Sequence, residues 1–140
     1  MGILVLALGF LPVVLFLFAL RLLDSYKLVH RGTLLGAMAS GVVAAILAFT
    51  LHQLLLQRLH LDPVVLRHWI APVTEECLKA AFVAWALRTD RVGFTVDAAI
   101  IGFAAGTGFA LSENLYYAGA LGDASVGLWL VRGLGTAVMH

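Results

Sequence analysis

The sequence is poor in charge and contains a single cysteine. Charged residues make up 12% of its 140 residues, apolar residues 62%, and the mean hydropathy is +1.01. A soluble domain carries about 25% charged residues, so this composition excludes an ordinary soluble domain and indicates an integral membrane protein. The net charge of +1 gives no reason to expect a nucleic-acid partner. With Cys77 as the only cysteine, an intrachain disulfide framework is excluded.

Five hydrophobic segments account for most of the chain. Runs of about 20 apolar residues cross a bilayer as helices, so the sequence predicts an all-α, polytopic transmembrane helix bundle with a single membrane domain over 1–140. The approximate spans are 3–20, 33–56, 70–87, 97–119 and 126–140. The last span is too short to cross about 30 Å of hydrocarbon, which indicates a truncated helix and a missing C-terminal part. We expect spans three to five to pack together, with the first two flanking them.

The loops carry two further signals. Residues 58–69 read as a polar connector, in which the pair Asp62 and Pro63 indicates a turn or the start of a helix. The Lys and Arg residues lie mainly in the loops after the first and third spans, which favours an N-terminus outside the cytoplasm. The expected location is the cell membrane, with several passes.

The third span contains charged residues at positions that would lie in the hydrocarbon region of the membrane. Its sequence IAPVTEECLKAAFVAWAL includes Glu75, Glu76 and Lys79. Each such residue at the centre of a membrane helix costs roughly 2.5–3.5 kcal/mol, so all three should face the inside of the bundle. Lys79 follows Glu75 by four residues and Glu76 by three, so it can pair with either carboxylate. Two interpretations stay open, a structural ion pair between helices and a functional group that handles protons.

The fourth span adds a further acid at a similar depth. Glu113, followed by Asn114, lies near the end of this span, and Glu75 and Glu76 lie near the start of the preceding one. Because the two spans run antiparallel, the three carboxylates are expected at one level of the membrane. Carboxylates at this separation repel one another unless they are protonated, ion-paired or bound to a cation. By the same count His140 lies deeper.

Small and polar residues mark where helices approach one another. The second span is rich in Gly, Ala and Ser, and Gly102 and Gly106 of the fourth form a GxxxG spacing, which favours tight helix contact. His52 and Gln53, near the end of the second span, leave two interpretations open. Their side chains either reach the membrane interface or support a nearby site.

The third and fourth spans together resemble the PrsW family of intramembrane proteases, which is distantly related to the CAAX prenyl endopeptidases. The family motif EExxK matches Glu75–Lys79, and FxxxEN in a glycine-rich helix matches Phe109–Asn114. A histidine in the next membrane helix of the family matches His140, and a later histidine motif has no counterpart here. The resemblance covers residues from about 70 to 140, while the first two spans are generic.

This resemblance implies a metal-dependent peptidase that hydrolyses a membrane-anchored protein, such as an anti-sigma factor. The chemistry of the residues agrees, because a divalent metal held by carboxylate and imidazole activates water for hydrolysis. The expected roles are catalytic for Glu75 or Glu76, metal-binding for Glu113 and His140, and supporting for Lys79 and Asn114. Zinc is the expected metal, and the expected partners are the protein substrate and the lipid bilayer. The chain as given, without the later motif, is expected to be inactive.

Two other functions remain compatible with these residues. In a proton- or cation-binding transport bundle, Glu75, Glu76 and Glu113 would form a relay. Transporters of the usual design contain an internal repeat, and no second EExxK-like segment occurs in the first two spans, which argues against this function. An inactive scaffold of protease shape is the second alternative.

Overall fold

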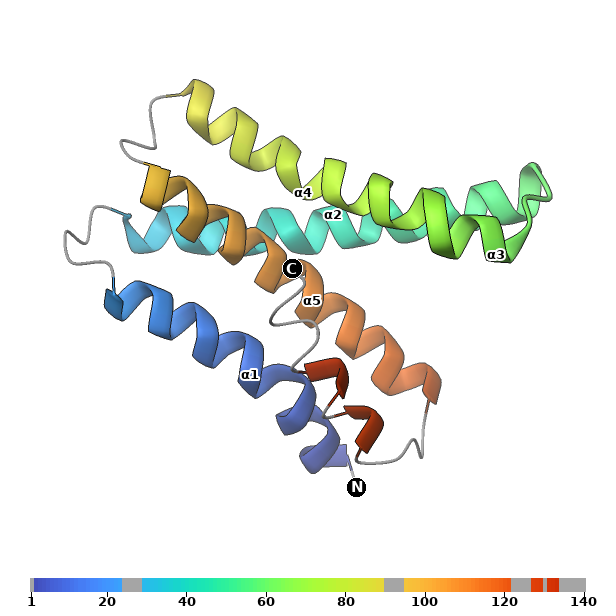
Figure 1. Ribbon diagram of the computed structural model, residues 1–140, viewed down its shortest axis with the longest axis horizontal. Helices are drawn as coiled ribbons and strands as arrows, with labels where there is room; N and C mark the ends of the chain where they lie inside the picture. The colour runs from blue at the N-terminus through green and yellow to red at the C-terminus, as the bar shows by residue number, and fades with distance from the viewer. Residues whose placement is uncertain (1, 24–28, 90–94, 122–126, 130, 134–140) are drawn as a thin grey trace.

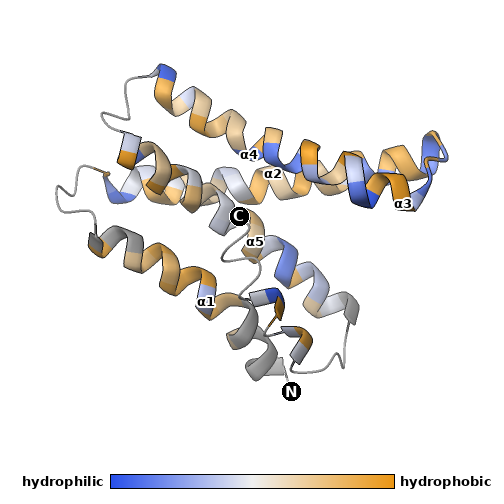
Figure 2. Cartoon of the chain, viewed as in Figure 1, coloured by the Kyte–Doolittle hydropathy of each residue, from blue (hydrophilic) through white to orange (hydrophobic). Residues whose placement is uncertain are grey.

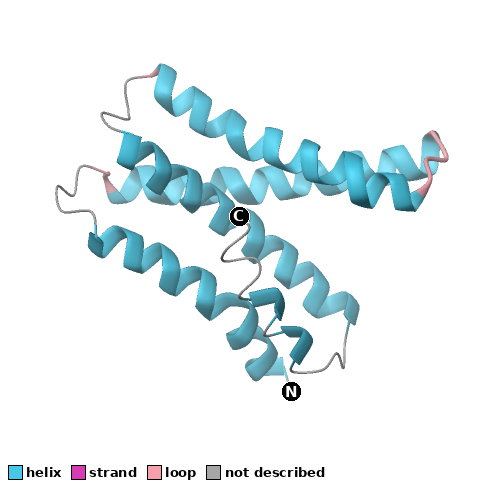
Figure 3. Ribbon diagram, in the orientation of Figure 1, coloured by secondary structure: helices cyan, strands magenta, loops and turns pink. Residues whose placement is uncertain are grey.

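The computed structural model describes residues 2–23, 29–89, 95–121, 127–129 and 131–133. Over these residues the chain is helical apart from short connections, and no strand occurs among them, as Figure 1 and Figure 3 show. The elements are α1 (Gly2–Leu23), α2 (Arg31–Arg58), α3 (Pro63–Val65), the π-helical turn η1 (Leu66–Ile70), α4 (Ala71–Arg88) and α5 (Thr95–Leu121). The predicted all-α bundle is confirmed. His140 and most of the fifth segment lie outside the described residues.

Helix α5 is the centre of the bundle. It contacts α1, α2 and α4, and its most extensive contact is with α2, which it crosses in Figure 1. Every residue from 104 to 110 is buried. The expectation that the second span flanks the bundle is therefore wrong, because α2 supplies the largest surface against α5. Small side chains explain this, since they let the α2 backbone come closer to α5 than the charged face of α4 can.

Two glycines allow the close approach of α2 and α5. A Cβ atom on Gly41 would lie 1.9 Å from the carbonyl oxygen of Ala105, and one on Gly108 would lie 1.9 Å from that of Met38. Neither position accepts a larger residue unless the backbones move apart. A Cβ on Gly102, by contrast, would find its nearest neighbour at an ordinary 3.7 Å. The tightest contact is thus made by Gly41 and Gly108 rather than by Gly102 of the predicted GxxxG pair.

The connector after α2 is shorter than predicted because a helix begins at Pro63. The Asp62 carboxylate accepts a hydrogen bond from the Val64 amide at 2.7 Å, which satisfies a donor of the first turn. Proline suits this position because its missing N–H would have no partner there. Residues 63–69, expected as part of a polar connector, are therefore helical, and the helix-start interpretation of the Asp62–Pro63 pair is correct.

The π-helical turn lies where a second proline enters the helix. The Ala71 amide donates to the carbonyl of Leu66, five residues earlier, in place of the usual four. Pro72 cannot donate to His68, and its ring would collide with that carbonyl in a regular α-helix. A widened turn relieves this collision and lets the helix continue into α4.

The described helices differ in how well they suit a lipid environment. Two are long and apolar enough to cross a membrane by length and composition, over Arg31–Arg58 and Thr95–Gly119. Hydrophilic residues gather on either side of α3 and recur along α4, whereas α2 is largely apolar between its ends (Figure 2). Large apolar side chains are exposed along α1 and α2, among them Leu15, Phe18 and Leu47. An apolar surface of this extent is typical of helices that face lipid.

Candidate active site between three helices

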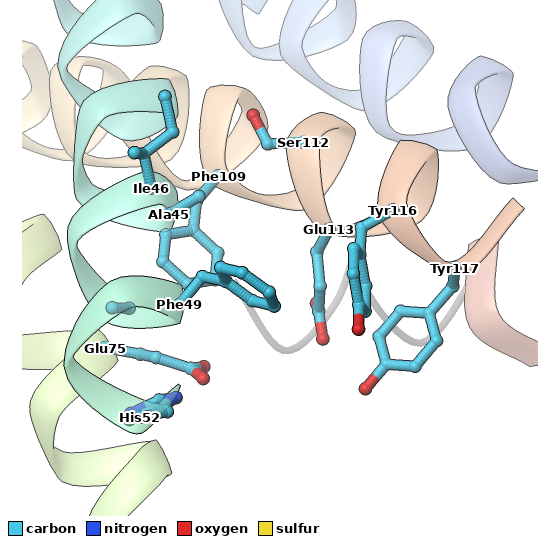
Figure 4. Close-up of a pocket in the computed structure, with 11 residues that line it drawn as sticks. Ala45, Ile46, Phe49, His52, Glu75, Phe109, Ser112, Glu113, Tyr116 and Tyr117 are labelled. Carbon is cyan, nitrogen blue, oxygen red and sulfur yellow. The ribbon is translucent and has the colours of Figure 1, made fainter. Parts of the chain in front are cut away.

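A pocket of about 260 Å³ lies where α2, α4 and α5 meet (Figure 4). Helix α4 contributes Glu75, α5 contributes Glu113 and α2 contributes His52. The remaining lining consists of apolar and hydroxyl-bearing side chains: Ala45, Ile46, Ala48, Phe49, Phe109, Ser112, Tyr116 and Tyr117. In Figure 4 the carboxylates of Glu75 and Glu113 extend into the pocket from opposite walls. Acids from the two sequence motifs therefore share one cavity.

The two adjacent glutamates of α4 face different surroundings. Neighbouring residues on a helix point about 100° apart, and Glu75 lines the pocket whereas Glu76 does not. The Glu76 side chain is 62% exposed and accepts a hydrogen bond from Lys79 Nζ at 2.5 Å, so the predicted contact of Lys79 with a glutamate is confirmed. Lys79 itself is buried, and its ammonium lies 4.5 Å from the ring centroid of Phe109. The lysine of EExxK thus packs on the phenylalanine of FxxxEN, joining α4 to α5.

Arg132, from the segment that follows α5, contacts the same site. Its Nη2 lies 3.7 Å from Glu113 Oε1 and 3.4 Å from Asn114 Oδ1. Its guanidinium carbon lies 3.9 Å from the ring centroid of Tyr117, a pocket residue, and Asn114 is fully buried. Arg132 is not among the site residues predicted from the sequence. The signal was present, because an arginine inside a hydrophobic segment is as costly as the charges of the third span.

The contacts of His52 favour the interpretation in which its side chain supports a nearby site. Its Nε2 lies 2.8 Å from Thr74 Oγ1, and the Thr74 hydroxyl is within 3.0 Å of the carbonyl oxygens of Ile70 and Ala71. A hydroxyl has one proton, and Thr74 donates it to the backbone, so His52 Nε2 is the donor in its own contact. The bond ties α2 to α4 at the residue before Glu75. His52 therefore lines the pocket beside Glu75.

The metal expected from the sequence can be tested against these side chains. Among the described residues, no three His, Cys, Asp or Glu side chains lie close enough together to hold a metal ion. Glu75, Glu113 and His52 offer oxygen and nitrogen donors of the kind that divalent metals accept, but they line a cavity rather than converge on a point. His140, the predicted second ligand, lies outside the described residues. These donor atoms are of the types that bind a divalent metal. Of the two predicted metal ligands, Glu113 and His140, Glu113 is the one within the described residues.

Comparison with known proteins identifies the group to which this chain belongs. The family model described as PrsW family intramembrane metalloprotease matches residues 24–140, a range that contains both motifs and every residue that lines the pocket. Searches of the curated proteins and of the solved structures found no match. Because the family model covers well over half of its length, the chain belongs to the PrsW family of intramembrane metalloproteases.

Proposed function

We propose that this protein hydrolyses a peptide bond of a membrane-anchored protein, and that the pocket between α2, α4 and α5 is its active site. One observation carries the assignment. Glu75 of EExxK and Glu113 of FxxxEN come from different helices and line the same pocket. A purely structural ion pair gives no reason for two carboxylates to share an open cavity, whereas metal-assisted hydrolysis uses one carboxylate as general base and another as metal ligand.

Glu75 is the general base of this proposal. Glu76, the alternative, is exposed and bonded to Lys79, whereas Glu75 is half-buried and extends into the pocket. Glu75 takes a proton from the attacking water and then passes it to the nitrogen of the leaving amine as the carbon–nitrogen bond breaks. A divalent metal, zinc by expectation, would be held by Glu113 and His140 and would supply Lewis acidity at the scissile carbonyl.

The supporting residues hold α4, which carries Glu75, at a fixed distance from α5, which carries Glu113. Lys79 bonds Glu76 and packs on Phe109, so it holds α4 against α5. Asn114, buried beside Glu113, lies within reach of the Arg132 guanidinium. Side chains fixed in this way preorganise a site before substrate arrives, which is a large part of catalysis.

The substrate of the proposal is a single-span protein of the cell membrane, anti-sigma-factor-like by family resemblance. Glu113 precedes the last residue of α5, Leu121, by about 12 Å along the helix axis, which favours cleavage near one face of the bilayer. The protein itself would cross the same membrane several times.

The test reconstitutes the full-length protein in liposomes with a single-span substrate and compares four variants, with and without a chelator. Glu75→Gln, Glu113→Gln and His140→Ala are expected to lower cleavage by about 10³-fold or more. Glu76→Gln, the matched control one residue away, is expected to stay within about tenfold of the unchanged protein, because its carboxylate lies outside the pocket. Chelation should abolish cleavage, and added zinc should restore it.

Two outcomes would contradict the proposal. Cleavage that survives Glu75→Gln would remove the general base and the mechanism with it. A transport function predicts a different result, in which the glutamate variants change proton or cation flux across the liposome membrane and no peptide bond is cut.

A further inference from the structure

The active-site pocket has a polar end and an apolar end. The polar end carries Glu75, Glu113 and His52, and it is where the proposed chemistry occurs. The apolar end is formed by Ala45, Ile46, Ala48, Phe49 and Phe109. Ala48 and Phe109 are almost completely buried and belong to one packed cluster, so the side chains at the base of the apolar end are held in place by packing.

The rim of the apolar end is exposed and carries large apolar and aromatic side chains. Ile46 is 59% exposed, Phe49 46% and Tyr116 51%. The rings of Phe49 and Tyr116 lie 5.1 Å apart between centroids and bridge α2 to α5 beside the opening (Figure 4). Since α2 can cross a membrane and its exposed side chains here are apolar, a group that enters over this rim arrives from the bilayer interior.

We propose that the apolar end is a specificity subsite that takes one large apolar side chain, of the size of leucine or phenylalanine, next to the bond cleaved. The inference rests on the proposed function. The cavity of about 260 Å³ equals the volume of about nine water molecules, room for one such side chain and the adjoining peptide group. A transmembrane substrate offers apolar side chains almost exclusively, so size is the property by which this subsite distinguishes among them.

Ala45 sets the size of the subsite. It lies on the α2 wall, half-buried at the edge of the cluster of Ala44, Ala48 and Phe109, and it also lines the cavity, so a longer side chain at this position extends along the wall into the cavity. Ala48, one turn further on, is packed against Phe109, and enlarging it would disturb the contact of α2 with α5 instead. Ala45→Leu therefore fills the subsite while leaving every polar residue of the pocket unchanged.

The experiment uses full-length protein in liposomes and four single-span substrates that differ only in the residue beside the cleaved bond: Ala, Val, Leu or Phe. The unchanged protein is expected to cleave the Leu and Phe substrates about 10–200-fold faster than the Ala substrate, as measured by kcat/KM. Ala45→Leu should lower kcat/KM for Leu and Phe by at least tenfold and leave the Ala substrate within about threefold. Ala39→Leu, the same change at an exposed position of α2, should alter none of the four rates.

A second measurement separates failure of the subsite from failure of the proposed function. The same four segments, as fluorescent peptides, are bound to the Glu75→Gln variant, in which the peptide bond stays intact. The Leu peptide should bind more tightly than the Ala peptide, and Ala45→Leu in that background should remove the difference. If the unchanged protein cuts none of the substrates, the proposed function fails, while this binding difference still decides the subsite.

Two results would overturn the subsite. One is an Ala45→Leu variant that lowers all four rates equally, and the other is one that changes none. Should Ala45→Leu fail to fold, Phe49→Ala tests the same idea from the rim, where the side chain is exposed. That variant widens the opening and should raise kcat/KM for a tryptophan substrate relative to leucine, and an unchanged ratio would contradict the proposal.

Discussion

Replacing Gly41 with alanine is expected to separate α2 from α5 and thereby to disable the pocket built on both. The new Cβ would lie 1.9 Å from the Ala105 carbonyl oxygen and 2.8 Å from the Phe109 nitrogen, where 3.0 Å is the practical lower limit, so the backbones must part by at least 1.1 Å. Neither atom belongs to a side chain, so no change of rotamer relieves the contact. Overpacking costs about 1–3 kcal/mol, against a gain of up to about 1 kcal/mol from helix propensity.

The net destabilisation is therefore about 1 kcal/mol, which corresponds to a fall in Tm of roughly 3–6 °C. Thermal unfolding in detergent measures it, and Gly36→Ala in the same helix is the matched control, because a Cβ there meets nothing within 4 Å. Gly36→Ala should keep or raise the Tm. Cleavage by Gly41→Ala should fall by about 10²-fold, since a displacement of about 1 Å separates the two walls of the pocket. Equal Tm values for Gly41→Ala and Gly36→Ala would refute the reasoning.

Two further predictions test the site and the start of the helix that carries it. Arg132→Gln should lower cleavage about 10–100-fold by releasing Glu113 and Asn114, and Arg132→Lys should recover little, because an ammonium lacks the planar guanidinium that lies over the Tyr117 ring. Cleavage by Arg132→Gln at the unchanged rate would contradict that role. Asp62→Ala should lower the stability by about 1 kcal/mol through loss of the bond to the Val64 amide, whereas Asp62→Asn should keep it. Indistinguishable Tm values for these two variants would show that the cap does not stabilise the helix.

The positions of the long helices were predictable because the length of an apolar run is a local property of sequence. The sequence predicts a connector over residues 63–69 because Arg67 and His68 make the stretch polar, although the Asp62–Pro63 pair carries the local signal for a helix start. In this stretch the hydrogen bond from the Val64 amide to Asp62 favours a helix in spite of the polar composition. Composition measures preference for lipid, whereas helix formation depends on the backbone and its first turn.

The pairing of helices and the direction of their side chains could not be obtained in the same way. Gly41 and Gly108 are each unremarkable in a membrane span, and only the structure reveals that they lie in one crossing. Depth along the helix brought Glu75 and Glu76 equally close to Glu113. Rotation about the helix axis separates them, and it depends on how α4 packs through Lys79. The rotation of a helix about its own axis depends on the assembled bundle and cannot be predicted from the sequence of that helix alone.

The widened turn η1 has a consequence for insertions and deletions. A π-helical turn holds one residue more than an α-helical turn, so it offsets all following residues by about 100° from an uninterrupted helix of the same length. Without this turn, Thr74 would occupy the direction that Glu75 now has, and a hydroxyl would replace a carboxylate in the pocket. Loss of one residue within Leu66–Ile70 would let the turn close and leave α4 in register. Loss of one residue between the turn and Thr74 would instead bring Glu76 to face Glu113, so the tolerance for length changes differs sharply over a few positions.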